Sequence, residues 1–472
     1  MFKGLDEALK FVADHEIRTI DLKFADLWGR WHRVTISSQI FNEELMAAGV
    51  GFDGSSVGLK SVDYGDMVLI PDLATGFMDP FSEQPLLSFI CNTHEAGTKR
   101  LFQQDPRQIA RRAEEYMDKL GIADQAIWGP ELEFYMFDRV RFYSNPYGTG
   151  YQVHCPESNH EPDPAQSAYF IKHHGGYHVV SPYDHFFDIR NNIVTMLEDI
   201  GVPIKYHHHE VGGAGQCEIE TPMMPTIQSA DAMMLAKYFI KNVASQHGYT
   251  ASFLPKPLYG EAGSGMHFHQ HIFKQGVNQF YNAEDELLFS KIGYQYICGL
   301  LEHAPALLAF TNPSTNSYRR LVPGFEAPVN CFFSLGNRSA AVRIPEYATE
   351  PDTVRFEYRS PDATCNVYLA MAGMVMAGVD GIKKEMDPKT KDFGPINDDI
   401  FSWSDAERSK IKSLPTSLEG ALDALEADHD FLLEGGVFSK EIIEMWIDKK
   451  RKEQRDVRNR PHPYEVELYF DM

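Results

Sequence analysis

The sequence lacks the features that would direct a chain to an oxidising compartment or into a membrane. Its six cysteines are scattered between positions 91 and 365 without a CxxC pair, which fits a reducing compartment. No apolar run approaches the roughly 20 residues that span a bilayer. The opening MFKGLDEALKFVADHE carries acidic residues where a signal peptide needs an apolar segment. We therefore expect a cytoplasmic protein that does not enter the membrane.

Basic residues are also scarce relative to acidic ones. The chain has 44 Lys and Arg against 67 Asp and Glu, a formal net charge of −23. Binding to nucleic acid through a broad basic surface is therefore not expected. The sequence contains no GxxxxGK[ST] motif, which argues against a P-loop nucleotide site, and we find no internal repeat. A length of 472 residues with 43% hydrophobic residues is enough for two soluble domains.

Pairs of carboxylates at alternate positions are the strongest chemical signal. Glu131 and Glu133 lie in GPELEF, Glu218 and Glu220 in QCEIE, and Glu357 in RFEYR. In a strand, residues two apart share one face, and the residues between these glutamates are apolar and read as buried. A sheet face of carboxylates above a core is costly unless cations lie against it. The pattern predicts a site for divalent metal ions.

The run YHHHEVGGAGQCEIE strengthens this prediction. His208 and Glu210 share one face, and the glycine-rich turn at 212–215 returns the chain so that Glu218 can approach Glu210. An exposed histidine patch is the competing interpretation. Ligands rich in oxygen favour Mg²⁺ or Mn²⁺ over zinc.

A second group of histidines lies in GSGMHFHQH. His267, His269 and His271 fall on one face of a predicted strand, where one of them could complete a carboxylate site or all could form a polar barrel face. The glycines Gly263 and Gly265 permit a tight turn or a close approach of the backbone to a ligand.

Arginines are concentrated in otherwise apolar surroundings toward the end of the same region. They are Arg320, Arg338, Arg343, Arg355 and Arg359. The planar guanidinium suits carboxylates and phosphates, and several together stabilise a phosphoryl group in transfer. Metal ions and arginines around nucleotide phosphates are the usual apparatus of phosphoryl transfer. FDGSS at 52–56, taken alone, is an ordinary turn around Asp53.

Together these motifs resemble type I glutamine synthetase, the large bacterial form. FDGSS, GPELEF, HHHEVGGAGQCE, GSGMHFH, TNSYRRLVPGFEAP, NRSAAVRIP, FEYRSPD and PHPYEVELYF follow in the family's order over essentially the whole chain. The resemblance implies an α+β fold, with a small β-grasp domain at 1–104 and a catalytic α/β domain at 105–472. The catalytic domain would contain a curved antiparallel sheet, forming a half-barrel at the active site, and a C-terminal docking tail. It also implies a dodecamer of two stacked six-membered rings, with each active site shared between subunits.

The resemblance further implies a role for individual residues. One metal ion, on the nucleotide phosphates, would be held by Glu131, His267 and Glu357, and a second by Glu133, Glu210 and Glu218. Glutamate would be bound by Gly263, Arg320, Glu326, Arg338 and Arg359. ATP would be contacted by His269, His271, Arg338, Arg343 and Arg355. The residues that act in catalysis would be Asp53, Glu326 and Arg338.

The implied reaction joins ammonia to L-glutamate at the expense of ATP, through γ-glutamyl phosphate, in nitrogen assimilation. At least two Mg²⁺ or Mn²⁺ ions would serve each active site. Asp53 of a neighbouring subunit would take a proton from ammonium, because only neutral ammonia attacks the acyl phosphate. Glu326 would lie on a loop that closes the site against water.

Some positions depart from the better-known members of the family. Ala262 stands where asparagine is frequent, Lys205 where an acidic residue is common, His271 in place of serine and Asp352 in place of lysine. Many members also carry a tyrosine that is adenylylated to stop activity, and Phe401 occupies that place. We therefore predict that this switch is absent, and that metabolites or an unidentified regulatory protein provide any control.

Three alternatives remain open from the sequence. A γ-glutamyl ligase for another amine could share the scaffold, although a small anionic pocket at Asp53 and Glu326 favours ammonium. A metallohydrolase would use the same Glu and His residues but would need neither ATP nor five arginines. A catalytically silent homologue would be expected to lose metal ligands, whereas all the assigned positions hold Glu or His.

Overall fold

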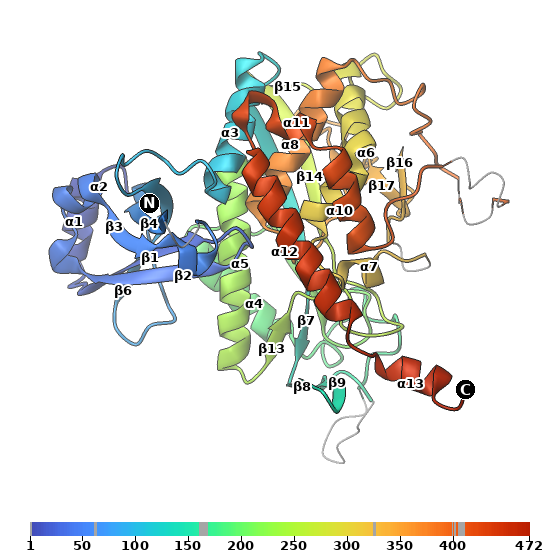
Figure 1. Ribbon diagram of the computed structural model, residues 1–472, viewed down its shortest axis with the longest axis horizontal. Helices are drawn as coiled ribbons and strands as arrows, with labels where there is room; N and C mark the ends of the chain where they lie inside the picture. Colours follow the sequence, from blue (N-terminus) through green and yellow to red (C-terminus); the bar gives the residue numbers. More distant parts are fainter. Residues whose placement is uncertain are drawn as a thin grey trace.

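The computed structural model describes residues 2–60, 64–159, 169–323, 327–398, 400, 403–404 and 411–472. A small sheet built from the first hundred residues lies on one side of a larger body of helices and strands (Figure 1). Within the described chain, no helix is both long and apolar enough to cross a membrane.

The N-terminal sheet has the strand order β2-β1-β6-β4-β3, with β5 paired to β6. Its strands are β1 (Thr19–Ala25), β2 (Trp31–Ser37), β3 (Val50–Asp53), β4 (Asp66–Pro71), β5 (Phe77–Met78) and β6 (Leu86–Glu95), with helices α1 (Leu5–Asp14) and α2 (Glu43–Ala48). β1 runs parallel to β6 and antiparallel to β2, in a β-grasp arrangement. β1 and β2 form a hairpin around Gly29, whose positive φ of 78° favours glycine.

A larger, curved sheet carries the candidate site. Its main path is β10-β11-β7-β14-β18-β17-β16, antiparallel except for the β16–β17 pair. These strands are β7 (Gln125–Phe137), β10 (Tyr206–His209), β11 (Gln216–Glu220), β14 (Met266–Lys274), β16 (Asn330–Ser334), β17 (Ala340–Arg343) and β18 (Phe356–Tyr358). Short strands at the margins are β12 (Met224–Pro225), β13 (Thr250–Ser252) and β15 (Val277–Asn278). The curled sheet forms the half-barrel expected from the sequence.

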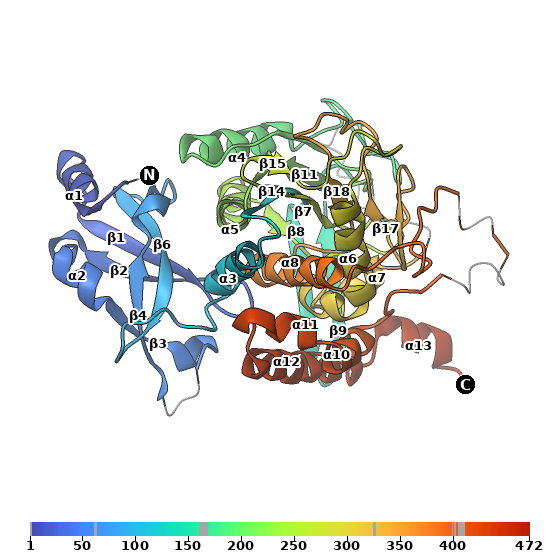
Figure 2. The same cartoon turned by 90° about the horizontal axis from the view of Figure 1, so that it is seen from above.

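Helices cover the apolar side of this sheet (Figures 1 and 2). They are α3 (Pro106–Lys119), α4 (Phe187–Asp199), α5 (Thr226–Gln246), α6 (Lys291–Thr311), α8 (Val367–Lys383), α10 (Leu418–Ala427) and α12 (Lys440–Arg458), with the short α7 (Ser317–Arg320) and α11 (Asp430–Leu433). α3 begins at Pro106, because the Asp105 side chain accepts the Arg107 N–H and proline suits the first helical position. The apolar residues between the paired glutamates, Leu132, Phe134, Ile219, Phe356 and Tyr358, are all fully buried.

Buried polar contacts join the N-terminal sheet to the helices of the larger body. The Arg107 side chain, from α3, donates to both carboxylate oxygens of Asp231 in α5 and to Asp72 beyond β4. Nearby, the Tyr238 hydroxyl of α5 donates to Asp79 at 2.9 Å. These contacts fix the angle between the two parts of the chain.

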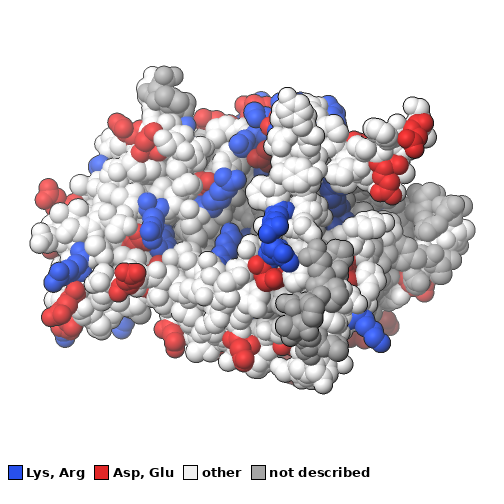
Figure 3. All heavy atoms as spheres, turned by 90° about the horizontal axis from the view of Figure 1, so that it is seen from below, with Lys and Arg blue, Asp and Glu red and all other residues white. Residues whose placement is uncertain are grey.

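Two segments differ in detail from the sequence pattern. The region 141–175, whose Asn, Pro, His, Gly and Ser residues are typical of a surface insertion, overlaps an exposed hairpin of β8 (Arg139–Asn145) and β9 (Gly148–His154). The alternating tail folds as a short exposed helix, α13 (Pro463–Tyr469), with a capping box between His462 and Glu465. On the face seen from below, Lys and Arg are interspersed with Asp and Glu (Figure 3). The domain boundary between residues 104 and 105 stays a prediction.

Candidate active site and metal centre

Two rows of polar residues cross the curved sheet on the side away from the core. In the first row, Glu131 of β7 lies between Glu220 of β11 and His267 of β14. In the second row, Glu133 of β7 is paired with Glu218 of β11, which is in turn opposite His208 of β10. Side chains directly across an antiparallel pair lie about 4.5–5.5 Å apart at Cβ, so the register itself concentrates the carboxylates.

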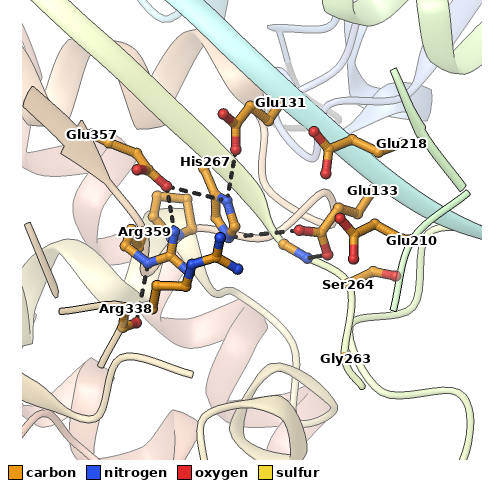
Figure 4. A network of polar contacts seen from close by, with 12 residues as sticks. Glu131, Glu133, Glu210, Glu218, Gly263, Ser264, His267, Arg338, Glu357 and Arg359 are labelled. Carbon is orange, nitrogen blue, oxygen red and sulfur yellow. Dashed lines mark hydrogen bonds and ion pairs between the residues drawn. The ribbon is translucent and has the colours of Figure 1, made fainter. Parts of the chain in front are cut away.

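The first cluster joins Glu131, His267 and Glu357, whose ligand atoms all lie within 4.8 Å of one another (Figure 4). His267 Nδ1 lies 3.0 Å from one oxygen of Glu131, and His269 Nε2 lies 2.9 Å from the other. Burial opposes ionisation, but the hydrogen bonds of these histidines hold the pKa of Glu131 well below its usual value. Burial likewise opposes ionisation of Glu357, and the neighbouring Arg359 guanidinium lowers its pKa.

The second cluster joins His208, Glu210 and Glu218, again within 4.8 Å. Here carboxylates face one another with little positive charge. Burial, followed by repulsion from Glu133 and Glu218, raises the pKa of Glu210 to about 8. Burial and the charges of Glu131 and Glu133 raise the pKa of Glu218 well above its usual value. The Glu133 carboxylate accepts the Gly265 N–H at 2.8 Å, so its position is fixed by backbone.

The donor set of both clusters fits a hard divalent cation. Carboxylate oxygens predominate, with one histidine in each cluster, which suits Mg²⁺ or Mn²⁺. The carboxylates of the second cluster repel one another, and a bound cation would stabilise them in the ionised form. The residues present could therefore hold two divalent ions on one sheet face.

Arginines line the neighbouring side of the site. Arg320 is buried, donates to the Ser360 carbonyl at 2.7 Å, and lies 3.2 Å from His267 Nε2. Arg359 lies 2.5 Å from Glu357 and donates to the Arg338 carbonyl. Both guanidinium groups are thus held beside the first cluster, where an anion could reach them.

Gly263 lies close to these arginines. A Cβ at this position would lie 2.6 Å from the Pro255 carbonyl oxygen and 2.7 Å from Cγ of Arg320. Real Cβ atoms do not tolerate such contacts, so the tight packing requires glycine. Ala262, beside it, accepts the Tyr135 hydroxyl through its carbonyl at 2.7 Å, a contact that does not use its side chain.

The remaining histidines and Arg355 lead from the first cluster to a cavity of about 400 Å³. Arg355 Nε donates to His269 Nδ1 at 3.3 Å, and Arg343 Nε lies 3.1 Å from Glu357. The cavity is lined by Gln125, Ile127, Met223, His271, Phe273, Asp352, Thr353 and Arg355. Burial lowers the pKa of His271 to about 4, so its imidazole is neutral. Arg355 joins this cavity to the first cluster. A phosphorylated ligand bound at the cluster could therefore place its other end in the cavity.

One sequence-predicted site residue, Asp53, lies apart from this assembly. Asp53 lies at the end of β3 in the N-terminal sheet, exposed, on a strand well away from β7 and β14 (Figure 1). Hydrogen bonds from the hydroxyls of Ser56 and Ser55 lower its pKa. Glu326 and Phe401 lie outside the described residues.

Sequence reasoning left two residues of the site without a role. His208 contributes a ligand atom to the second cluster, and Glu220 forms a further group with Glu131 and His269. The spacing of Glu218 and Glu220 placed both on one face, but no local signal shows that Glu220 lies directly opposite Glu131. Lys205 lies at the edge of this group, 2.6 Å from Glu220.

Comparison with known proteins gives a consistent result. Residues 16–96 match the β-grasp domain of glutamine synthetase, and residues 103–469 match its catalytic domain. The chain is 45% identical to the glutamine synthetase of Frankia alni over the full length of both, and 46% identical to that of a Nostoc species over 99% of each.

Solved structures agree with the sequence relatives. The glutamine synthetase of Plasmodium falciparum superposes with a TM-score of 0.89 at 28% identity, covering 99% of each chain. GmaS in complex with ADP superposes with a TM-score of 0.81 at 26% identity, covering 98% of this chain and 99% of that one. By its two domains, its relatives and its fold, this chain is an enzyme that belongs to the glutamine synthetase family.

Proposed function

We propose that this chain catalyses the ATP-dependent ligation of ammonia to L-glutamate, giving L-glutamine, ADP and phosphate. One observation carries the proposal: two rows of carboxylates on one sheet face, in reach of histidines, lie beside the buried guanidinium groups of Arg320 and Arg359. Neither a hydrolase nor a binding protein needs this combination, whereas phosphoryl transfer uses both parts. The family relationship supports glutamate, ammonia and ATP as the substrates.

The two clusters are proposed to hold two divalent ions, either Mg²⁺ or Mn²⁺. Glu131, His267 and Glu357 would hold the ion nearer the nucleotide, and Glu133, Glu210 and Glu218, joined by His208, the ion nearer glutamate. When bound, the ions neutralise the charge of the phosphates and of the transferring group. The carboxylates contribute by fixing where that positive charge lies before substrates arrive.

The arginines are proposed to orient the two anionic substrates. Arg320 and Arg359 would bind the α-carboxylate of glutamate, with the tight backbone at Gly263 completing the pocket. Arg338 and Arg343 would lie along the phosphates, with His269, His271 and Arg355 toward the nucleoside. The γ-carboxylate of glutamate then attacks the γ-phosphorus of ATP, the bond to ADP breaks, and γ-glutamyl phosphate forms.

The second half-reaction is proposed to need a neighbouring copy of the chain. Asp53 is exposed at the end of β3, and this strand lies away from β7 and β14 of the same chain, so Asp53 is available to another subunit. Its lowered pKa keeps it ionised, which suits a residue that attracts ammonium. Asp53 would take one proton, ammonia would attack the acyl carbon, and phosphate would leave. Glu326 would close the site against water.

We further propose the assembly and regulation that the family resemblance implies. Two six-membered rings would stack into a dodecamer, with each active site shared between adjacent subunits of a ring. The enzyme would not be controlled by tyrosine adenylylation, since Phe401 has no hydroxyl to modify.

Product analysis tests the proposed reaction directly. The protein is incubated with glutamate, ATP and Mg²⁺, and ADP release is compared with ammonium, putrescine, ethanolamine or no amine. We expect ammonium to stimulate ADP release and glutamine to be the product. Stimulation by a larger amine but not by ammonium would instead identify a γ-glutamyl ligase of different amine specificity. Phosphate release from a substrate without nucleotide would identify a hydrolase.

A further inference from the structure

A group of metal-binding side chains lies on surface loops, off the curved sheet that carries the two clusters. His173, His174 and Glu261 offer one ligand atom each, and these three atoms lie within 4.8 Å of one another. The two histidines are in a turn, and Glu261 is in the loop that leads into β14, so none of the three is on a strand. The proposed function assigns no role to any of these residues.

The carboxylate of Glu261 is already oriented by the chain around it. Its side chain is 14% exposed. Oε2 accepts the Gly213 N–H at 2.9 Å and the His174 N–H at 3.4 Å, and Oε1 lies 2.6 Å from His173 Nδ1. A ligand atom held in place before an ion arrives lowers the entropic cost of binding.

The two histidines are turned toward the same carboxylate. In a strand, consecutive side chains point to opposite sides, whereas here the rings stack with their centroids 3.9 Å apart. His174 has a φ of 54°, which is uncommon for a residue with a side chain. Its Nε2 lies 2.7 Å from the Gly260 carbonyl oxygen and 3.9 Å from Glu261 Oε2. The turn therefore brings two imidazole nitrogens to one side of Glu261.

The donor set of this group differs from that of the two clusters. Two imidazole nitrogens and one carboxylate oxygen suit zinc, which binds such sets of three with water in the fourth position. Mg²⁺ prefers oxygen ligands alone. The side chains of His173 and His174 are 62% and 40% exposed, so an ion and its water can reach them from solvent.

We propose that His173, His174 and Glu261 bind one Zn²⁺ ion at the surface. Zinc–ligand distances of about 2.0–2.2 Å require His173 Nδ1 and Glu261 Oε1 to move apart from 2.6 Å. The exposed rings can make this movement into solvent. His173 Nδ1 and His174 Nε2 must each present a lone pair, so a proton on either atom moves to the other ring nitrogen, or to water if the ring is charged.

Such an ion would join three segments of the chain. Through Glu261 Oε2 it reaches Gly213, in the turn between β10 and β11. These segments are already closely packed, since a Cβ at Gly213 would lie 2.7 Å from the Lys172 carbonyl oxygen and 2.9 Å from Glu261 Oε1. Gly263 lies two residues after Glu261, so the ion would also hold one wall of the glutamate pocket, a consequence that rests on the proposed function.

Two other arrangements have to be distinguished from this site. A protonated His173 could form an ion pair with Glu261, in which case no metal binds there. Zinc could also enter the carboxylate clusters, because it binds most nitrogen and oxygen ligands tightly. Both are separated from the proposal by comparing variants rather than by the zinc count of the wild type alone.

Isothermal titration of the full-length protein with Zn²⁺, in millimolar Mg²⁺ to occupy the clusters, tests the proposal. We expect the wild type to bind one Zn²⁺ per chain more than His173→Ala or His174→Ala. His247→Ala, which removes another exposed histidine at the end of α5, should bind as many ions as the wild type. The difference of one ion should persist in the background of Glu218→Gln, which lacks a ligand of the second cluster.

Hydrogen exchange adds a measurement that an ion in the clusters does not reproduce. Zn²⁺ should slow amide exchange at 212–214 and 260–263 about threefold or more in the wild type, because three segments are joined. It should leave exchange there unchanged in His173→Ala. Equal unfolding temperatures of this variant and the wild type without zinc would show that the variant is folded.

Equal zinc counts in the wild type, His173→Ala and His174→Ala overturn the proposal and leave Glu261 as an ion-pair partner of His173. That outcome does not touch the proposed function, because glutamine formation is measured with Mg²⁺ and without zinc. The proposed function fails separately if ammonium gives no glutamine.

Discussion

Two buried groups of charged residues in this molecule are built in opposite ways. In the N-terminal sheet, Lys23 lies 2.5 Å from Asp21 and 3.0 Å from Asp79, and these residues are at most 5% exposed. Thr35 donates to Asp21 and Tyr238 to Asp79, so both carboxylates have further partners. On the curved sheet, by contrast, Glu210 and Glu218 are buried against each other and against further carboxylates, and their pKa values are raised.

The difference separates a structural ion cluster from a functional one. A buried charge whose partners come from the chain itself is complete when the protein has folded, and its loss is felt as lost stability. A buried charge that lacks such partners costs stability, and that cost is offset when a ligand of the opposite sign binds. Variants in the two regions should therefore move stability and activity in different directions.

Glu218→Gln should have the largest effect on activity. It removes a proposed metal ligand, and we expect kcat/KM to fall by about 10³-fold or more, about 4 kcal/mol of transition-state stabilisation. Without metal, its free energy of unfolding should equal or exceed that of the wild type, because a repelled carboxylate is replaced by a neutral amide. The rate of glutamine formation measures kcat/KM, and denaturant unfolding in the presence of a chelator measures the stability without metal. Glu444→Gln, exposed on α12, is the control. A large loss of stability of Glu218→Gln without metal would contradict the proposed difference between the two groups of charged residues.

Lys23→Met should show the reverse behaviour. Asp21 and Asp79 would both lose a buried ammonium, leaving Asp21 with the exposed Arg33 at 3.7 Å, and we expect the free energy of unfolding to fall by about 3–5 kcal/mol. The folded fraction should keep its kcat within about twofold, since Lys23 lies in the N-terminal sheet, away from both clusters. Unfolding curves measure the free energy of unfolding, and active-site titration of the folded enzyme gives the kcat. A variant with full stability but low kcat would show that the two regions are not separable.

The pH dependence of stability without metal should sharpen the comparison. Glu210, with a pKa of about 8 against an ordinary value of 4.5, keeps its proton in the folded state while the unfolded chain has lost it. The folded state therefore binds more protons between these values, and the stability contributed by this group falls as pH rises toward about 8. Divalent ions require the carboxylate, so their affinity should rise over the same interval. Unfolding at about pH 6 and about pH 8.5 with chelator, then with Mn²⁺, measures both trends, and a metal affinity that does not change with pH would contradict the assignment.

Asp53→Asn should have the smallest of these effects. We expect the KM for ammonium to rise about tenfold, while stability stays within about 0.5 kcal/mol because the side chain is exposed. The defect should shrink at higher pH, where more ammonia is already neutral. Steady-state kinetics at several pH values test this, with Glu43→Gln on α2 as the control. An equal loss at every pH would argue that Asp53 does not remove a proton.

Much of the local structure could be predicted from the sequence, because its causes are local. The cap at Asp105, the proline that follows it and the turn at Gly29 act within a few residues. The alternation of glutamates with apolar residues likewise fixed which side of each strand is buried. Even the approach of Glu218 to Glu210 could be predicted from the single glycine-rich turn between them.

Contacts between distant strands could not be predicted in the same way. Glu220 is opposite Glu131 because of the register between β11 and β7, which depends on packing across the whole sheet. The sequence therefore placed Glu220 on the correct face without assigning it a partner. In the C-terminal tail, a proline with a capping box begins the helix α13, and the docking of this tail stays a prediction.

The contacts of Arg107 have a consequence for how copies of this chain would come together. Since its guanidinium joins Asp72 to Asp231, the angle between the N-terminal sheet and the larger body is set during folding, and each molecule can act as a rigid wedge. Identical rigid wedges placed head to tail close on themselves only when that angle divides a full circle, and otherwise they spiral. If copies of this chain assemble in that way, a guanidinium far from the chemistry would help to decide between a closed ring and an open filament.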